Sequence, residues 1–206
     1  MPQLWRTDGS HLLDCAFGDF DGDGVTDALR ANGSTWSVSS SAREPWIEVR
    51  PYGVRAASVR VGDFTGDGTD DVFWIASNTW HLWDPAENSW TTDHRKPVAD
   101  IEISSLVVAD FDGDERVDLA RTDGEGWSWL RGGTNSWAPL RASTDQTEYS
   151  DIRAAVIGRF SGGDRRADAI RYASSRFPSQ SRFGFVLWDG ASDAFRPWSP
   201  LWQEMR

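Results

Sequence analysis

One short segment rich in aspartate and glycine recurs four times along the chain. The four copies read GDFDGDGVTD, GDFTGDGTDD, ADFDGDERVD and GRFSGGDRRAD. The residue before the shared phenylalanine sets their register, and it is Asp19, Asp63, Asp110 or Arg159. Successive copies are 44, 47 and 49 residues apart, and 47 residues follow Arg159. A period of this length indicates a repeat architecture, in which each unit buries its apolar faces against its neighbours.

Each repeat contains four short stretches of strand character separated by turn residues. An apolar stretch leads into the aspartate loop, a second follows the loop, and two tryptophan-containing or phenylalanine-containing stretches complete the unit. Sustained 3.6-residue periodicity is absent, and four strands in about 45 residues are typical of a propeller blade. We therefore predict an all-β fold, a β-propeller of four-stranded antiparallel blades, in a single domain over 1–206. The repeats are placed at 16–59, 60–106, 107–155 and 156–206, with 1–15 as an extra strand.

The sequence leaves the closure of the propeller open. The segment PQLWRT near the N-terminus resembles SPLWQE near the C-terminus, so an N-terminal strand is available to complete a blade. The fourth repeat already holds a fourth strand of its own. The alternatives are a small four-bladed ring, an arc of a larger ring, and a ring completed by a second copy of the chain.

The charge of the chain excludes several classes of partner. Lys and Arg number 21 against 32 Asp and Glu, which gives a formal net charge of −11. This deficit of cations argues against nucleic-acid binding and against attraction to anionic membranes. No run approaches the roughly 18 apolar residues of a spanning helix, so no membrane insertion is expected. The N-terminal segment lacks the pattern of a secretory signal, and the single cysteine, Cys15, forbids an intrachain disulfide.

The first aspartate loop has the composition of a calcium site. Asp19, Asp21, Asp23 and Asp27 occupy loop positions 1, 3, 5 and 9, and Val25 offers a backbone carbonyl at position 7. Oxygen-only ligands on a tight loop suit a hard cation of calcium size. Four carboxylates in one turn repel each other unless a cation lies between them.

The second and third loops repeat the pattern, with substitutions. Their residues at positions 1, 3, 5, 7 and 9 are Asp63, Thr65, Asp67, Thr69 and Asp71 in one and Asp110, Asp112, Asp114, Arg116 and Asp118 in the other. Position 6 is glycine in two loops but Glu115 in the third, where a positive φ would cause strain. The fourth loop has Arg159 and Ser161 at positions 1 and 3, so about three calcium sites are expected. The three complete loops hold 11 carboxylates, which equals the formal excess and explains the acidity without a cationic partner.

An EF-hand is the obvious competing interpretation of these loops. It requires a glutamate at position 12 and flanking helices. Position 12 is instead Arg30, Trp74 or Arg121, and the flanking segments have strand character. The EF-hand interpretation is therefore rejected.

The segments GDFDGDGVTD, GDFTGDGTDD and ADFDGDERVD resemble the FG-GAP, or VCBS, repeat. That repeat builds the propeller of integrin α-subunits, many bacterial secreted proteins and some propeller lectins. The resemblance implies calcium bound by the carboxylates and threonines of the three loops, with a structural rather than a catalytic role. It also implies an extracellular or cell-surface location.

No catalytic motif accompanies the repeats. The three histidines are His11, His81 and His94, and neither HExxH nor GxSxG is present. A bound cation would keep the loop carboxylates ionised, which opposes the raised pKa of a general acid. We therefore expect that the protein is not an enzyme.

Two groups stand out among the 13 tryptophans. One group recurs in nearly every repeat and is first a packing signal; its members, with one phenylalanine, are Trp36, Trp80, Trp127, Phe185, Trp46, Trp90, Trp137 and Trp198. Trp83 and Trp188 recur in only two repeats, each followed by aspartate, Asp84 or Asp189. Aromatic faces stack on sugar rings and carboxylates accept bonds from hydroxyls, so these four residues are the candidate ligand-binding set.

Together these features predict a non-catalytic, calcium-stabilised binding module. The tryptophan content favours a glycan as the ligand. The alternatives are a protein–protein adhesion or scaffold module with an extracellular protein partner, and a structural repeat domain of a larger secreted protein.

Overall fold

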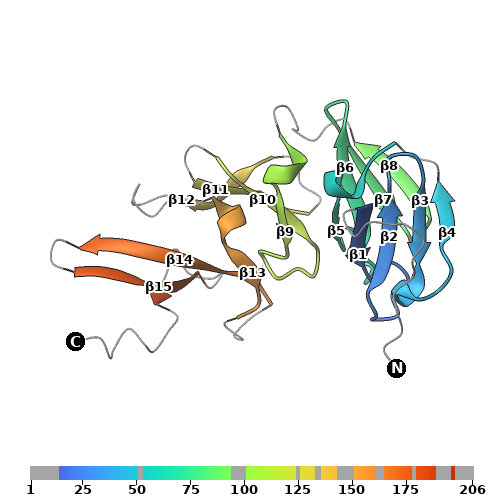
Figure 1. Ribbon diagram of the computed structural model, residues 1–206. Helices are drawn as coiled ribbons and strands as arrows, with labels where there is room; N and C mark the ends of the chain where they lie inside the picture. Colours follow the sequence, from blue (N-terminus) through green and yellow to red (C-terminus); the bar gives the residue numbers. More distant parts are fainter. Residues whose placement is uncertain are drawn as a thin grey trace, which may run out of the picture. The chain divides into compact units, whose positions relative to one another are not determined.

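The computed structural model describes residues 14–50, 53–93, 101–123, 126–132, 136–142, 151–160, 165–177, 180–188 and 196–197. The chain contacts divide it into two compact units, Met1–Ser104 and Ser105–Arg206, and each unit contains two four-stranded sheets (Figure 1). The described residues contain short 3-10 turns and no α-helix. None of their helical segments is long and apolar enough to cross a bilayer.

The first unit contains the sheets of the first two repeats. Their strands are β1 (Cys15–Gly18), β2 (Asp27–Ala31), β3 (Trp36–Ser39) and β4 (Ile47–Arg50), then β5 (Arg60–Gly62), β6 (Asp71–Ala76), β7 (Thr79–Asp84) and β8 (Ser89–Asp93). Strand β1 begins one residue before the predicted repeat boundary at 16. The extra strand predicted over 1–15 lies, up to residue 13, outside the described residues.

The second unit repeats this arrangement. Its strands are β9 (Val107–Ala109), β10 (Asp118–Thr122), β11 (Gly126–Leu130) and β12 (Ala138–Ala142), then β13 (Val156–Gly158), β14 (Asp168–Phe177), β15 (Gln180–Trp188) and β16 (Arg196–Pro197). In all four sheets the strands pair antiparallel in chain order. Four consecutive up-and-down, four-stranded sheets are the blades of a β-propeller. The predicted all-β propeller fold is confirmed.

Each aspartate loop connects the first and second strands of its blade. The loop begins after the first strand, and its position-9 aspartate is the first residue of the second strand. The cross-strand pairs that close the four loops are equivalent, namely Gly18 with Asp27, Gly62 with Asp71, Ala109 with Asp118, and Gly158 with Asp168. The three complete loops thus give the same strand register, and the fourth gives an equivalent closing pair with a loop one residue longer.

Successive loops of one unit are joined through their backbones. The Asp70 amide donates to the Asp19 carbonyl at 2.7 Å, and the Asp19 amide donates to an Asp70 carboxylate oxygen at 2.9 Å. In the second unit the Ala167 amide donates to the Asp110 carbonyl at 2.7 Å. The residue before position 9 of one loop is therefore bonded to position 1 of the preceding loop.

Tryptophans fill the space between the two blades of the first unit. Trp36 is 0% exposed, and its ring lies 5.1 Å from that of Trp74, 6.0 Å from Trp83 and 5.5 Å from Trp90. Trp80, which is equivalent to Trp36 in the repeat, is also buried. The packing role predicted for the recurring tryptophans is confirmed for these rings.

The second unit has a core of the same kind. Trp127 lies edge-on to Trp188, with 5.9 Å between ring centroids, and both are buried against Phe111, Ala120 and Ile152. Trp198 lies outside the described residues.

Candidate cation sites in the aspartate loops

The aspartate at position 1 organises the backbone of each complete loop. One Asp19 carboxylate oxygen accepts bonds from the amides of Gly22 and Asp23 at 2.8 and 3.1 Å, and the other accepts from Gly24 at 2.8 Å. Equivalent bonds surround Asp63 and Asp110. The loop is thus wound around this carboxylate.

The aspartate at position 9 ties the loop to the blade. Asp27, Asp71 and Asp118, and the equivalent Asp168 of the fourth loop, which is one residue longer, are all 0% exposed. Each accepts a hydrogen bond from the amide of the loop phenylalanine, at 2.9 Å from Phe20, 2.8 Å from Phe64, 2.9 Å from Phe111 and 2.5 Å from Phe160. The bond persists in the fourth loop, which lacks the acidic residues of positions 1 and 3. Position 9 therefore has a structural role that the sequence analysis, which treated it as a cation ligand, did not identify.

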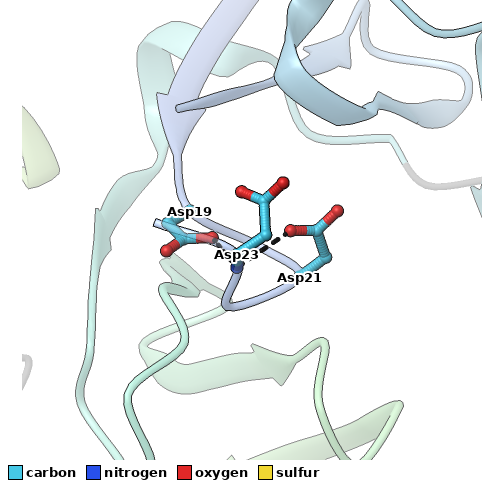
Figure 2. Close-up of side chains that lie close together, drawn as sticks. All are labelled: Asp19, Asp21 and Asp23. Carbon is cyan, nitrogen blue, oxygen red and sulfur yellow. Dashed lines mark hydrogen bonds between the residues drawn. The ribbon is translucent and has the colours of Figure 1, made fainter. Parts of the chain in front are cut away.

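The first loop brings three carboxylates together. Oxygens of Asp19, Asp21 and Asp23 all lie within 4.8 Å of one another, and Figure 2 shows the three side chains on one turn, with the Asp23 amide bonded to the other two. None of the ion pairs between described residues includes these carboxylates. Asp27 is not a member of the cluster, and its second oxygen accepts the Ser41 amide at 2.6 Å. The exposed Val25 donates its amide to Asp23 at 2.7 Å.

The second loop contains buried oxygens that lack hydrogen-bond partners. These are one Asp71 carboxylate oxygen and the Thr65 hydroxyl. The first and third blades supply the amides of Ser41 and Gly132 to this aspartate oxygen, but the equivalent residue here is Pro85, which has no N–H. Burial raises the pKa of Asp71 to about 7. A cation would satisfy this oxygen and favour its ionised form.

The other acidic side chains of the second loop are nearer to solvent. Asp67 accepts bonds from the Thr69 hydroxyl and amide at 2.6 and 2.8 Å, and these bonds hold its pKa below the usual value. Asp63 accepts the three loop amides described above. The loop therefore presents carboxylate oxygens at positions 1, 5 and 9 and a hydroxyl at position 3.

The third loop keeps the same backbone despite its glutamate. Glu115 has φ of 72°, close to the 81° of Gly24 and the 92° of Gly68. The predicted positive φ at position 6 is confirmed, at a cost of up to about 1 kcal/mol for a residue with a side chain. Oxygens of Asp110, Asp112 and Asp118 lie within 4.8 Å of one another. Asp114 accepts the amide of Arg116 at 2.9 Å, so position 7 is held as in the first loop.

The donor chemistry of the loops fits calcium. All the converging ligand atoms are carboxylate, hydroxyl or carbonyl oxygens, which hard divalent cations prefer. Carboxylate oxygens converge in the first and third loops, and the second leaves a buried carboxylate oxygen unsatisfied. Asp19, Asp21 and Asp23 would hold an ion in the first loop, and Asp71, with its unsatisfied oxygen, would be the principal ligand in the second, with Asp63 and Asp67 as the other candidates.

Comparison with known families agrees with this loop geometry. The model of the FG-GAP-like repeat matches residues 63–121, from position 1 of the second loop to the strand after the third loop. These residues are similar to the FG-GAP-like repeat. The matched segment contains two of the three complete loops, and the first loop has the same bonds as those two. No curated protein matches the chain.

A solved structure supports the fold independently. A chain of the Photorhabdus luminescens Tc holotoxin pore aligns with a TM-score of 0.50 and 15% sequence identity. The alignment covers 88% of this chain but only 8% of that chain. At this identity the similarity supports the blade architecture alone.

Outside the FG-GAP-like repeat, the fourth loop is only partly described. Residues 161–164, including Ser161, lie outside the described residues. The prediction that this loop holds no calcium therefore stays a prediction. The described part shows Asp168 bonded to Phe160 as in the other blades.

The prediction of a sugar-binding surface at Trp83 and Trp188 assumed that their indole faces are exposed, and this assumption was wrong. Trp83 is 3% exposed and Trp188 is 2% exposed, so neither indole offers a face to a ligand. Each packs on the loop phenylalanine of the preceding blade, Phe20 or Phe111, with centroid distances of 6.1 and 6.3 Å. Asp84 is also buried and its charge raises the pKa of Asp71, so it lies beside the second loop. Asp189 lies outside the described residues.

The sequence also did not predict that an arginine side chain forms a salt bridge with the third loop. The Arg131 guanidinium donates through Nε to a carboxylate oxygen of Asp112 at 2.6 Å, and Nη2 bonds the same oxygen. This hydrogen bond and the charge of Asp112 raise the pKa of Arg131. The pairing joins residues 19 apart in sequence, so the loop motif alone gave no sign of it.

Proposed function

We propose that the chain is a non-catalytic β-propeller module whose aspartate loops bind calcium and whose blades present a surface to a partner. The observation that carries the proposal is the cluster of Asp19, Asp21 and Asp23 oxygens, which has no pairing cation among the described residues. Calcium supplies two positive charges and flexible oxygen coordination, which this donor set requires. The FG-GAP-like repeat at 63–121 supports the same assignment for the neighbouring loops.

The environment of His81 supports the absence of catalysis. Its ring stacks on Trp74 with a centroid distance of 5.1 Å and an interplanar angle of 10°. Its Nδ1 is 3.1 Å from the Thr92 hydroxyl. The ring is thus used in packing and in a bond across the sheet. Loop carboxylates bound to calcium are ionised, which leaves them unsuited to donate a proton.

Replacement of one loop carboxylate should remove one calcium ion. Asp21→Ala deletes an exposed member of the first cluster and leaves the backbone bonds to Asp19 in place. We expect calorimetric titration to show one ion fewer than in the unchanged chain. Glu48→Ala, which removes an exposed charge from β4 outside the loops, is the matched control and should retain every ion. Equal ion counts in Asp21→Ala and Glu48→Ala would contradict the assignment.

Three further tryptophans have a face covered by an arginine, which favours a protein over a glycan as the partner. Three partly buried indoles of the outer strands and their flanks are each covered by an arginine guanidinium. The pairs are Arg30 over Trp46 at 4.7 Å, Arg50 over Trp90 at 4.7 Å and Arg121 over Trp137 at 4.4 Å. A sugar ring would have to displace the guanidinium and forfeit its cation–π attraction, which is about 0.5–1 kcal/mol at exposed sites.

Simple sugars should therefore leave the tryptophan fluorescence of the chain unchanged. We expect no saturable response to monosaccharides in calcium-containing buffer and no binding on a glycan array. Calcium itself serves as the positive control, because Trp83 packs on Phe20 of the first loop and we expect an ion bound there to change its surroundings. A saturable change on addition of one sugar would instead restore the glycan as the partner class.

We also propose an extracellular or cell-surface location. FG-GAP-like repeats are typical of extracellular proteins, and free calcium there is high enough to fill sites of modest affinity. Among the described residues, no ion pair neutralises the carboxylates of the first loop, and this fits calcium sites of modest affinity.

A further inference from the structure

One position of the blade places a different charge against each aspartate loop. Ser40, Asp84 and Arg131 each lie 21 residues after the position-1 aspartate of their own repeat. The preceding residues pair with the residue after position 9, as Ser39 with Ala28 and Leu130 with Leu119. The sheet register therefore brings this position next to its loop in every complete blade.

The contacts of this position are equivalent in the first and third blades. The Ser40 hydroxyl donates to the Asp21 carboxylate at 2.8 Å, and Arg131 Nε donates to the Asp112 carboxylate at 2.6 Å. Asp21 and Asp112 both occupy loop position 3, and the same oxygen, Oδ2, accepts in each case. A neutral hydroxyl in one blade is thus replaced by a guanidinium in the other.

The second blade has the opposite substitution. Its loop position 3 is the neutral Thr65. The residue 21 positions after its first aspartate is Asp84, which is 7% exposed and acts electrostatically on Asp71. Asp84 restores the negative charge that Thr65 lacks. Asp84 thus adds a fourth carboxylate to Asp63, Asp67 and Asp71 of the second loop, which has no guanidinium among its described contacts.

We propose that the residue at this position sets the calcium affinity of each loop, and that Arg131 acts as a tethered cation that weakens calcium binding at the third loop. The inference rests on the proposed calcium-binding function of the loops. A guanidinium and a divalent ion that share Asp112 repel each other, and the Arg131 bonds to Asp112 must be strained or broken to admit the ion. The third loop should bind calcium at least about tenfold more weakly than the first, a difference of about 1.4 kcal/mol.

The test is calcium titration calorimetry on the full chain and on reciprocal variants. The unchanged chain should bind two ions tightly. Arg131→Ser, which installs the residue found in the first blade, should convert the third loop into a third tight site. Ser40→Arg should remove the tight site of the first loop. Arg153→Ser is the charge-matched control, because Arg153 pairs with Asp151 away from the loops, and it should behave as the unchanged chain does.

The outcomes separate this inference from the proposed function. Three equally tight ions in the unchanged chain, with no gain in Arg131→Ser, would overturn the role of Arg131 and leave calcium binding intact. A gain of equal size in Arg153→Ser would also overturn it, because the effect would then be one of net charge. Binding of no calcium by the unchanged chain or by Arg131→Ser would overturn the proposed function together with the inference.

Discussion

Chelation of divalent ions is expected to lower the melting temperature of this protein by roughly 5–10 °C for each ion lost. An ion that binds only the folded state stabilises it by about 2.7 kcal/mol when its free concentration is about 100 times Kd. For a chain of this size, each kcal/mol corresponds to about 2–4 °C in the melting temperature. We expect the first and second loops to bind most tightly, because no described arginine bonds to their carboxylates as Arg131 does in the third loop, so loss of both ions should roughly double the shift. Differential scanning calorimetry with and without chelator measures it directly.

The controls for this experiment distinguish site binding from general screening of charge. Addition of sodium chloride at matched ionic strength should not restore the melting temperature, whereas excess calcium should restore it fully. Asp21→Ala should show a smaller chelator-dependent shift than the unchanged chain. A melting temperature that does not respond to chelator would count directly against calcium in these loops.

Trp36→Ala should destabilise the first unit by about 3–5 kcal/mol, the range for truncation of a buried aromatic side chain. Trp36 is fully buried and lies in ring contact with Trp74, Trp83 and Trp90. Its indole N–H also donates to the Val54 carbonyl at 3.0 Å, and truncation would leave that acceptor without this donor. Urea unfolding in saturating calcium, followed by far-ultraviolet circular dichroism, gives the free energy of unfolding.

A second tryptophan provides the matched comparison for this prediction. Trp46 is only partly buried and packs under Arg30, so Trp46→Ala should cost about 1 kcal/mol or less. Trp36→Phe keeps an aromatic ring but loses the bond to Val54, and it should fall between the two alanine variants. Equal losses in Trp36→Ala and Trp46→Ala would show that the tryptophan cluster is not the centre of the unit.

The blades were predictable from the sequence because the information for them is local. Each aspartate loop contains its own turn residues, and an aspartate at its end pairs with the last residue of the preceding strand, from Gly18 with Asp27 to Gly158 with Asp168. The positive φ at Glu115 followed from the glycines at the equivalent position. Features of this kind need only the alignment of the repeats to one another.

The features that were missed depend on contacts between strands or between blades. Trp83 and Trp188 occur in the second blade of each unit, where each packs on a phenylalanine of the first blade. Their recurrence in two repeats out of four thus reflects pairing of blades, and it was mistaken for a sign of exposure. Likewise, the partnerless Asp71 oxygen follows from Pro85 across the sheet, which a loop motif does not contain.

The bond from the position-9 aspartate to the loop phenylalanine holds the loop to the blade independently of any ion. Asp168 makes this bond in a loop that begins with arginine, so the bond between loop and blade does not require acidic residues at positions 1 and 3. A repeat of this kind can therefore keep the pairing of its first two strands whether or not its loop has the ligands for a cation. The number of ions bound by a propeller built this way therefore has to be determined for each blade, and it does not follow from the number of blades.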